Sequence, residues 1–240
     1  MTYRESAAPA ALRDLVECRW AATGRAGARI LPDGCMDLIE IGETVLVAGP
    51  DTAAFVSDLG GAPAHGLRFR PGALPRLLGV PAAELRDTRV PLRELRPDIG
   101  GGPLLGVTAR LLSGDPADQT TPWPLPQLAE VTGRLADGAA VRDVADEIGW
   151  SSRNLQRHCA AVYGYGPAML RRVLRFRAAV GMLRAGVAVT DAAARAGYAD
   201  QPHLHREVRA LAGVGVATLR QDGSAANRST VVPSGSVTVA

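Results

Sequence analysis

The chain has 240 residues, of which 47% are hydrophobic and 21% charged, and its formal net charge is +3. This composition is typical of a globular protein with a sizeable core and excludes a largely disordered chain. No apolar run reaches the roughly 18 residues of a membrane span, and no secretory signal is visible at the start, so we expect no membrane partner. Three widely separated cysteines argue against a disulfide or metal framework and favour a cytoplasmic protein.

The first 112 residues have the pattern of short strands mixed with short helices. A β-rich run over 28–31 ends at Pro32-Asp33-Gly34, a strong turn signal. The runs 36–41 and 44–48 flank Gly42-Glu43 and predict a hairpin. Residues 66–70 alternate apolar and basic side chains, as a half-buried strand does, and 72–79 and 82–86 are typical of short helices. We therefore expect a small, β-rich, barrel-like domain over residues 1–112.

The rest of the chain is predicted to be helical. A helix is expected over 104–112, and the Gly- and Pro-rich stretch 113–126 is predicted to be an interdomain linker. Residues 127–222 have helical periodicity. After Pro167, apolar residues spaced by four, three, four and three predict an amphipathic helix of about 18 residues that ends before Gly186. Residues 223–240 are expected to be a disordered tail. The predicted fold class is α+β.

Two stretches in the helical part share one layout, 48 residues apart. In the first, Ala145 precedes Gly149 by four residues and Trp150 follows; in the second, the same places hold Ala193, Gly197 and Tyr198. A small residue permits close helix crossing, and glycine suits the left-handed residue that ends a helix. Ser151 or Ser152 is expected to cap the next helix in the first unit, and Asp200 in the second, with Thr190 capping the helix before it. Each stretch therefore predicts a helix-turn-helix.

The second helix of each unit leaves polar and basic side chains pointing outward. Leu155 in the first unit and Leu204 and Val208 in the second are expected to face inward. Arginine and the amide side chains make forked contacts to guanine and adenine edges in the major groove of DNA. The predicted DNA-binding residues are Ser152, Arg153, Asn154, Gln156, Arg157, Gln201, His203, His205 and Arg206.

Charge and spacing support the same interpretation. Residues 134–220 hold 13 arginines against 7 acidic residues, whereas the remainder carries an acidic excess. A local excess of positive charge is what a phosphate backbone attracts, although a solvated basic face would look the same. A helix of about 18 residues is about 27 Å long at 1.5 Å per residue. It could hold two recognition helices near successive major grooves, which lie about 34 Å apart.

The helical part resembles the AraC/XylS family of transcription regulators. The resemblance is carried by Ser151-x-x-x-Leu155-x-Arg157, by Gly164-x-x-Pro167, by Arg175-Phe176 and by the stretch from Gly197 to Glu207. It implies a seven-helix domain that contacts two adjacent major grooves, with RNA polymerase as a candidate partner. Cys159 and Val208 stand where the family usually has Phe, Val216 where Pro is usual, and His205 where Ser or Thr is common.

The N-terminal part resembles an uncharacterised domain that precedes such DNA-binding domains. The residues that carry this resemblance are Leu31-Pro32-Asp33-Gly34-Cys35-Met36-Asp37-Leu38-Ile39 and Gly66-Leu67-Arg68-Phe69-Arg70-Pro71-Gly72. The resemblance implies control by a small-molecule effector or assembly into a homodimer, and it supplies no ligand. Arg68 and Arg70 could bind an anionic effector or simply be solvated.

The sequence predicts no catalytic residue, no metal site and no cofactor. Asp33 is expected to bond its own backbone in the turn, and Cys18 and Cys35 lack a nearby His or Lys that would activate a thiol. His203 and His205 are two residues apart, which suits metal binding poorly. The leading hypothesis is a cytoplasmic, ligand-responsive transcription regulator that is not an enzyme. Two alternatives are a DNA-targeted enzyme, such as a cysteine alkyl-transfer repair protein, and a DNA-binding module without an effector.

Overall fold

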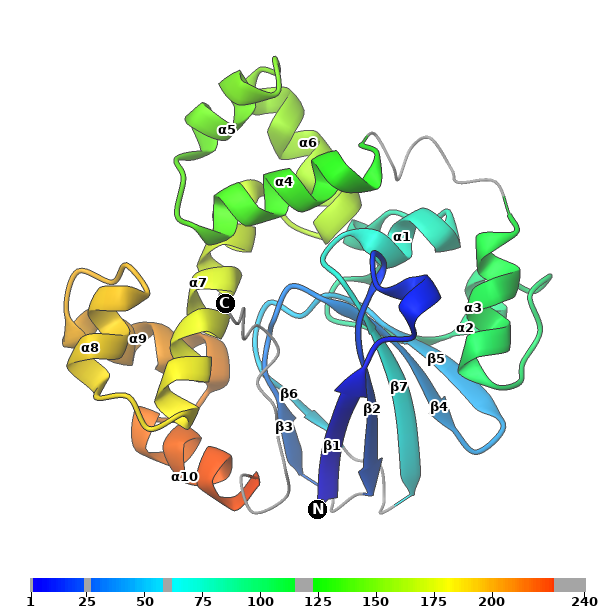
Figure 1. The fold of residues 1–240 in the computed structure, drawn as a ribbon, viewed down its shortest axis with the longest axis horizontal. Helices are drawn as coiled ribbons and strands as arrows, with labels where there is room; N and C mark the ends of the chain where they lie inside the picture. Colours follow the sequence, from blue (N-terminus) through cyan, green and yellow to red (C-terminus); the bar gives the residue numbers. More distant parts are fainter. Residues whose placement is uncertain (1, 24–26, 58–61, 115–122, 227–240) are drawn as a thin grey trace.

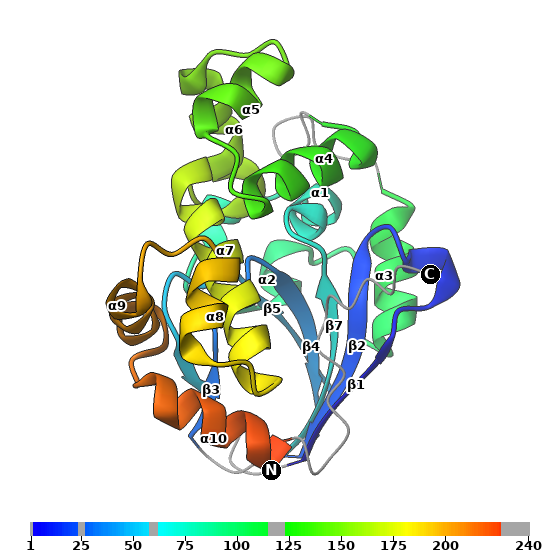
Figure 2. The same ribbon diagram turned by 60° about the vertical axis from the view of Figure 1, so that its left-hand side comes forward.

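The computed structural model describes residues 2–23, 27–57, 62–114 and 123–226. It has a strand-rich N-terminal domain and a helical C-terminal part, which confirms the α+β prediction. Helices α4–α6 lie at one end of a long helix, α7, and α8–α10 lie at the other end (Figure 1). The N-terminal sheet lies along one side of α7 (Figures 1 and 2).

The N-terminal domain is built on a six-stranded antiparallel sheet in the order β1-β2-β7-β4-β5-β8. Among the described residues the sheet is open, with β1 and β8 at its edges. A separate two-stranded ribbon pairs β3 with β6. The strands are β1 (Thr2–Ala7), β2 (Val16–Thr23), β3 (Ala28–Ile30), β4 (Met36–Ile41), β5 (Thr44–Ala48), β6 (Phe55–Ser57), β7 (Pro63–Phe69) and β8 (Arg89–Pro91).

Short helices cover one face of this sheet. Leu38, Val47 and Leu67 lie opposite one another across β4, β5 and β7, and all three are fully or almost fully buried against the helices. Burial of such side chains is the main stabilising contribution to the domain. The helices are η1 (Ala10–Leu12), α1 (Ala73–Leu78), η2 (Ala82–Leu85), α2 (Leu92–Leu95) and α3 (Leu104–Leu112).

The opposite face of the sheet carries a network of buried charges. Arg68 on β7 lies 3.2 Å from Asp33, 3.7 Å from Asp37 and 3.0 Å from Glu5. Burial raises the pKa of Asp37 to about 6, although Arg68 and a hydrogen bond from Trp20 act in the opposite direction. Arg68 is therefore part of a structural ion-pair network, and the sequence-based alternatives of anion binding or free solvation do not describe it.

The helical part consists of two groups of three helices, α4–α6 and α8–α10, joined by the long helix α7. Its elements are α4 (Leu125–Ala136), α5 (Val141–Glu147), α6 (Ser152–Tyr163), α7 (Pro167–Arg184), α8 (Val189–Arg195), α9 (Gln201–Ala212) and α10 (Val216–Ala226). The 18 residues of α7 and the bounds of α3 agree with the sequence prediction. Helix α4 begins at Leu125, two residues before the predicted start at 127, directly after Pro124.

The predicted domain limits at 112, 126 and 222 stay predictions. Most of the predicted linker, residues 115–122, and most of the predicted tail, residues 227–240, lie outside the described residues. Helix α10 continues through residues 223–226, which were expected to belong to the tail.

Candidate nucleic-acid interface

The two repeated stretches end their first helices in the same way, although the second turn is one residue longer before its cap. The backbone N–H of Trp150 donates to the carbonyl of Ala145 at 2.8 Å, and that of Tyr198 donates to Ala193 at 2.9 Å. The glycine before each aromatic residue has a positive φ, +70° at Gly149 and +74° at Gly197. This hydrogen bond satisfies a carbonyl that a helix end leaves without a partner, and glycine adopts the required left-handed conformation without strain. The repeat in the sequence is thus a repeat in backbone geometry.

Side-chain caps begin the second helix of each unit. The hydroxyl of Ser151 accepts from the N–H of Asn154 at 3.2 Å, so Ser151 rather than Ser152 is the cap of α6. The carboxylate of Asp200 accepts from the N–H of His203 at 2.6 Å, as predicted. The prediction for Thr190 is wrong, because α8 already begins at Val189 and Ala188 precedes it without a side-chain cap.

The aromatic residue of each turn packs the corner of its unit. Trp150 lies 5.4 Å from Trp123 and 4.5 Å from His158, measured between ring centroids. Tyr198 has the guanidinium of Arg175 over its ring at 4.3 Å and the edge of His203 at 5.1 Å. The sequence did not indicate Trp123, because it lies in the stretch interpreted as a linker; its nearly complete burial shows that it belongs to the first core.

Helix α6 presents all five predicted residues of the first unit, Ser152, Arg153, Asn154, Gln156 and Arg157, as exposed side chains. Leu155 is fully buried and anchors the helix, as predicted. Arg157 lies 3.5 Å from the amide oxygen of Asn154. The amide of Gln156 turns back and fills the space that a Cβ at Gly166 would occupy. Gln156 would therefore have to change rotamer to reach a base.

Helix α9 presents Gln201, His205 and Arg206 as exposed side chains. The side-chain nitrogen atoms of Gln201 and His205 are 3.3 Å apart, one helical turn along the same face. Leu204 and Val208 are fully buried, as predicted. His203 is only partly exposed, since its ring packs edge-on against Tyr198. The structure thus brings three of the four predicted residues of this unit to the surface and holds the fourth against the corner.

Ion pairs that the sequence did not indicate join α9 to α7. Glu207 accepts from Arg172 at 2.8 and 3.0 Å and lies 3.9 Å from Arg175. Two parallel N–H···O bonds from one guanidinium fix orientation as well as distance. These contacts tie the second recognition helix to the long helix. The three residues lie on two different helices, so no local sequence pattern indicated these contacts.

Comparison with known proteins agrees with this geometry. Residues 144–222 match the family model of a helix-turn-helix domain, and residues 4–91 match that of a domain of unknown function, DUF6597. The chain carries an AraC-type helix-turn-helix domain. It is preceded by the DUF6597 domain, and a domain of the AraC type supports a DNA-binding transcription regulator. No curated protein matches the chain in sequence.

Solved structures of similar fold include two of ToxT from Vibrio cholerae. One is 9% identical to this chain and covers 91% of it and 97% of ToxT, with a TM-score of 0.45. An apo ToxT variant is 7% identical and covers 85% of this chain and 96% of its own, with a TM-score of 0.48. These likenesses are too distant to carry function from one protein to the other.

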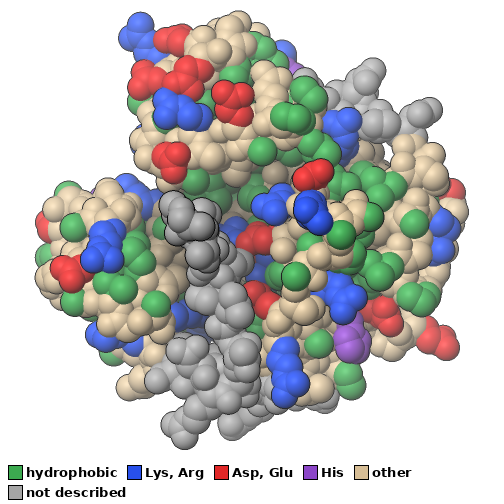
Figure 3. All heavy atoms as spheres, viewed as in Figure 1, with side chains coloured by type: hydrophobic (Ala, Val, Ile, Leu, Met, Phe, Trp, Pro, Cys, Tyr) green, Lys and Arg blue, Asp and Glu red, His purple; other side chains and the backbone are tan. Residues whose placement is uncertain are grey.

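On the face seen in Figure 3, basic and acidic side chains are interspersed over both parts of the chain. None of the described helices combines the length and apolar character that a membrane span requires. Residues 2–23, 27–57, 62–114 and 123–226 contain no group of three side chains suited to holding a metal ion.

The three cysteine thiols are buried and uncharged. Burial raises the pKa of Cys18 and of Cys159 to about 12, and it raises the pKa of Cys35 well above its ordinary value. A nucleophilic cysteine needs the thiolate form near neutral pH and access to its substrate. These environments agree with structural roles and give no support to a cysteine alkyl-transfer activity.

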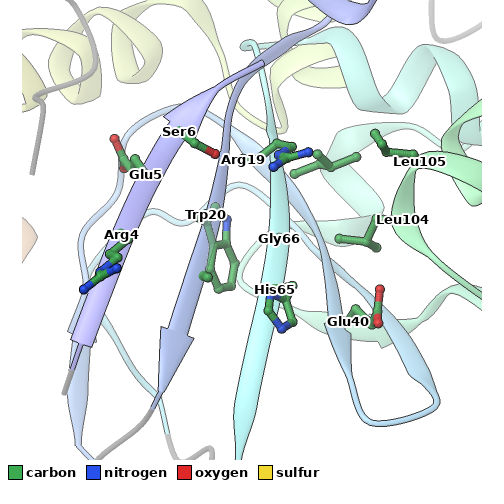
Figure 4. Close-up of a pocket in the computed structure, with 12 residues that line it drawn as sticks. Arg4, Glu5, Ser6, Arg19, Trp20, Glu40, His65, Gly66, Leu104 and Leu105 are labelled. Carbon is green, nitrogen blue, oxygen red and sulfur yellow. The ribbon is translucent and has the colours of Figure 1, made fainter. Parts of the chain in front are cut away.

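A groove of about 370 Å³ opens on the helix-covered side of the N-terminal sheet, beyond the end of its core (Figure 4). The strand register places Arg4, Ala21, His65 and Glu40 in one row across β1, β2, β7 and β4. Arg19 belongs to the next row, and Leu104 and Leu105 of α3 form the apolar side. Within the described part of the chain, Arg4 and Arg19 have no ion-pair partner. The groove thus combines unneutralised positive charge with an apolar wall.

Proposed function

We propose that this protein regulates transcription by reading two successive major grooves of DNA, one with α6 and one with α9. The observation that carries the proposal is the pair of turns with the same helix-ending hydrogen bond, each of which presents a capped helix with exposed polar and basic side chains. A short helix delivered by such a turn fits the major groove, with residues near its N-terminus toward the bases. Helix α7 provides a span of about 27 Å between the units.

The exposed side chains suit different partners on DNA. Arg153, Arg157 and Arg206 have the forked donors that pair with guanine, whereas the amides of Asn154, Gln156 and Gln201 suit adenine. Ser152 stands in the first turn of α6, where hydroxyl and backbone donors commonly bind phosphate. In the second unit, His203 and His205 complete the proposed set, and His205 has the freer ring.

Selection from a random DNA library, followed by footprinting of the selected site, tests this function. We expect two protected regions whose centres lie about 10–10.5 base pairs apart on one face of the duplex. Loss of affinity should be steep as salt rises, since the basic domain releases counterions from phosphate. A single protected region of one groove, or no enrichment at all, would contradict reading by both units.

We further propose that the N-terminal groove holds the effector, a small organic anion with an apolar part. Arg4, Arg19 and His65 would face the anionic group, and Leu104 and Leu105 would cover the apolar part. Glu40 at the other end of the row would disfavour a second negative charge nearby. A ligand of this kind would act on DNA affinity only if it bound two states of the protein unequally.

Thermal unfolding of the full chain with benzoate and hexanoate, and with their neutral amides as controls, tests this assignment. The carboxylates should raise the melting temperature progressively as their concentration increases, and the amides should not. The variants Arg4→Ala and Arg19→Ala should lose the effect. Equal behaviour of acids and amides would show that the groove does not select an anion.

The remaining features of the proposed function rest on the AraC-type domain and, for self-association, on the N-terminal domain. We propose a non-enzymatic cytoplasmic regulator that contacts RNA polymerase and that self-associates through the N-terminal domain. Sedimentation of the free protein and of its DNA complex distinguishes one chain per site from two.

A further inference from the structure

The two helix-turn-helix units have separate hydrophobic cores. Helices α4–α6 pack on the first half of α7, around Leu170 and Val173, and we call this the first unit. Helices α8–α10 pack on the second half of α7, around Phe176 and Val180, and we call this the second unit. A single helix that joins two cores can bend, so the distance between α6 and α9 depends on whatever else contacts both units.

The N-terminal domain contacts the carboxyl end of both recognition helices. The guanidinium of Arg86 donates to the carbonyl of Gly164 at the end of α6, at 3.4 Å. Arg29 of β3 donates to the carbonyl of Ala212 at the end of α9, at 3.0 Å. The backbone N–H of Ala54, just before β6, donates to Leu211 at 2.7 Å. Carbonyl groups in a last turn lack intrahelical partners and carry partial negative charge, so arginine donors bind them favourably.

A third contact lies at the middle of α7. Arg177 forms an ion pair with Glu17 of β2, and it also donates to the carbonyl of Asp33 at 3.4 Å. The side chains of Glu17 and Arg177 are 14% and 23% exposed. Next to them, Leu170 and Leu174 of α7 approach Gly34, which has a φ of +85°. The DUF6597 domain therefore contacts the helical part at both ends and in the centre.

These contacts leave the proposed DNA face free. Arg153, Arg157, Gln201 and Arg206 are exposed, whereas the N-terminal domain binds the opposite, carboxyl ends of α6 and α9. Docking of the N-terminal domain thus does not cover the recognition side chains. It constrains where the two helices stand relative to each other.

We propose that the N-terminal domain sets the separation of the two recognition helices, and that Arg29 and Arg177 are the positioning residues that determine which spacing of the DNA site is read. The inference rests on the proposed reading of DNA by both units. The ribbon of β3 and β6 contributes most to this positioning, because both contacts to the end of α9 come from this ribbon or its border. A shift of the ribbon would move α9 and change the preferred spacing.

Distance measurement between spin labels tests the positioning without DNA. Labels at Arg142→Cys on α5 and Arg195→Cys on α8, both exposed, report on the first and second unit in the full chain, whose native cysteines are buried. We expect one narrow distance distribution in the parent protein. Arg29→Ala and Arg177→Ala should each broaden or shift it, while Arg93→Ala, an exposed arginine of α2, should not. Distributions unchanged by both substitutions would overturn the proposal.

Binding to the selected DNA site, with one or two base pairs inserted or deleted between its halves, gives the second readout. The parent protein should prefer the selected spacing, and Arg29→Ala should reduce that preference by about fivefold or more, the lower range of energetic coupling between sites. Retention of the full preference by Arg29→Ala and Arg177→Ala would refute the proposal while leaving DNA reading intact. Failure to select any two-part site, with label distances still sensitive to Arg29, would instead refute the proposed function.

Discussion

Arg177, in the middle of α7, forms an ion pair with Glu17 on β2, 160 residues earlier in the chain. The Sγ of Cys35 lies 3.3 Å from the carboxylate of Glu17 and 3.5 Å from the guanidinium, so the thiol fills the space beside the pair. Burial alone would raise the pKa of Glu17, but Arg177, together with Arg68 and a hydrogen bond from Cys35, outweighs burial and the pKa is lowered. The pair therefore favours the folded, docked arrangement of the two domains.

We expect Glu17→Gln to lower the free energy of unfolding at pH 7. The substitution leaves the guanidinium of Arg177 partly buried without its charge partner, and the loss should be roughly 1–3 kcal/mol because both side chains keep some contact with solvent. A glutamate with a lowered pKa contributes stability that is present when the pH is above the ordinary pKa of glutamate. This contribution is lost as the pH falls through the lowered pKa. The difference between parent and variant in urea unfolding should therefore shrink in acid.

A double-mutant cycle isolates this interaction. Arg177→Met combined with Glu17→Gln should cost less than the two single changes added together, since neither charge is then left alone. Arg93→Ala serves as the control and should alter stability by less than about 0.5 kcal/mol. Strict additivity would mean that the two side chains do not interact in solution.

Arg157→Ala and Arg206→Ala should each weaken specific DNA binding by about 1–3 kcal/mol and relax selectivity at the contacted base pairs. The two arginines occupy equivalent places, two residues after Leu155 on α6 and two after Leu204 on α9. Fluorescence anisotropy with the selected site and with single-base variants of it measures both effects. Arg93→Ala removes the same charge from the N-terminal domain and should change affinity little. Unaltered footprints in both variants would contradict the proposal that both helix-turn-helix units contact the bases.

The sequence predicted the helix-turn-helix units well because their signals are local. Within about ten residues, Gly149, Trp150 and Ser151 define a helix end, a corner and a cap, and the structure places all three as expected. The orientation of Gln156 was not predictable in the same way. Its amide lies against Gly166, in the loop beyond the end of its own helix, and this contact depends on how the chain returns into α7.

Features that depend on distant partners escaped prediction. Strand β2 has a mixed sequence, Val16-Glu17-Cys18-Arg19, with a bulge between Val16 and Cys18, so it lacks the alternation that marks a strand; its pairing with β7 forms it. One apolar face was expected on α7, but Leu170 and Leu174 extend the buried surface: they belong to the core of the first unit and also approach Gly34 of the N-terminal domain. The approach to Gly34 depends on docking of the N-terminal domain, which no local pattern in α7 indicates.

Gly72→Ala should destabilise the protein more than Gly138→Ala. Both glycines have a positive φ, +78° and +87°, so each alanine pays a backbone cost of about 1–2 kcal/mol. A Cβ at Gly138 would meet nothing within 4 Å, whereas one at Gly72 would lie 2.6 Å from Val162 and 2.9 Å from Leu128. Overpacking adds about 1–3 kcal/mol at Gly72.

Urea unfolding of the two variants measures this difference directly. The comparison is matched, because the backbone strain is shared and only the interdomain contact differs. Gly72 belongs to the N-terminal domain, and its neighbours Val162 and Leu128 belong to the first unit. Equal losses in the two variants would show that the domains separate easily at this point.

Asp37→Asn should change how stability depends on pH. Burial raises the pKa of Asp37 in the folded protein to about 6, so the folded state holds this proton more tightly than the unfolded chain does, whose aspartates titrate near 3.9. A carboxyl group with a raised pKa contributes stability that is fully present below its pKa in the unfolded chain. This contribution is lost as the pH rises through its pKa in the folded protein. The amide cannot titrate and can still accept the hydrogen bond that Trp20 donates at 2.6 Å.

Between pH 4 and pH 7, the free energy of unfolding of the variant should therefore rise relative to that of the parent protein. The difference should reach up to about 3 kcal/mol for a pKa shift of this size. Part of the gain at pH 7 is offset, because Arg68 loses one of the carboxylates near it while Glu5 and Asp33 remain. Unfolding curves at half-unit pH steps measure the change in slope, and Glu40→Gln on the same strand controls for loss of a carboxylate outside the ion-pair network of Arg68. Parallel profiles for Asp37→Asn and the parent protein would mean that the carboxyl of Asp37 titrates in the folded protein as it does in the unfolded chain.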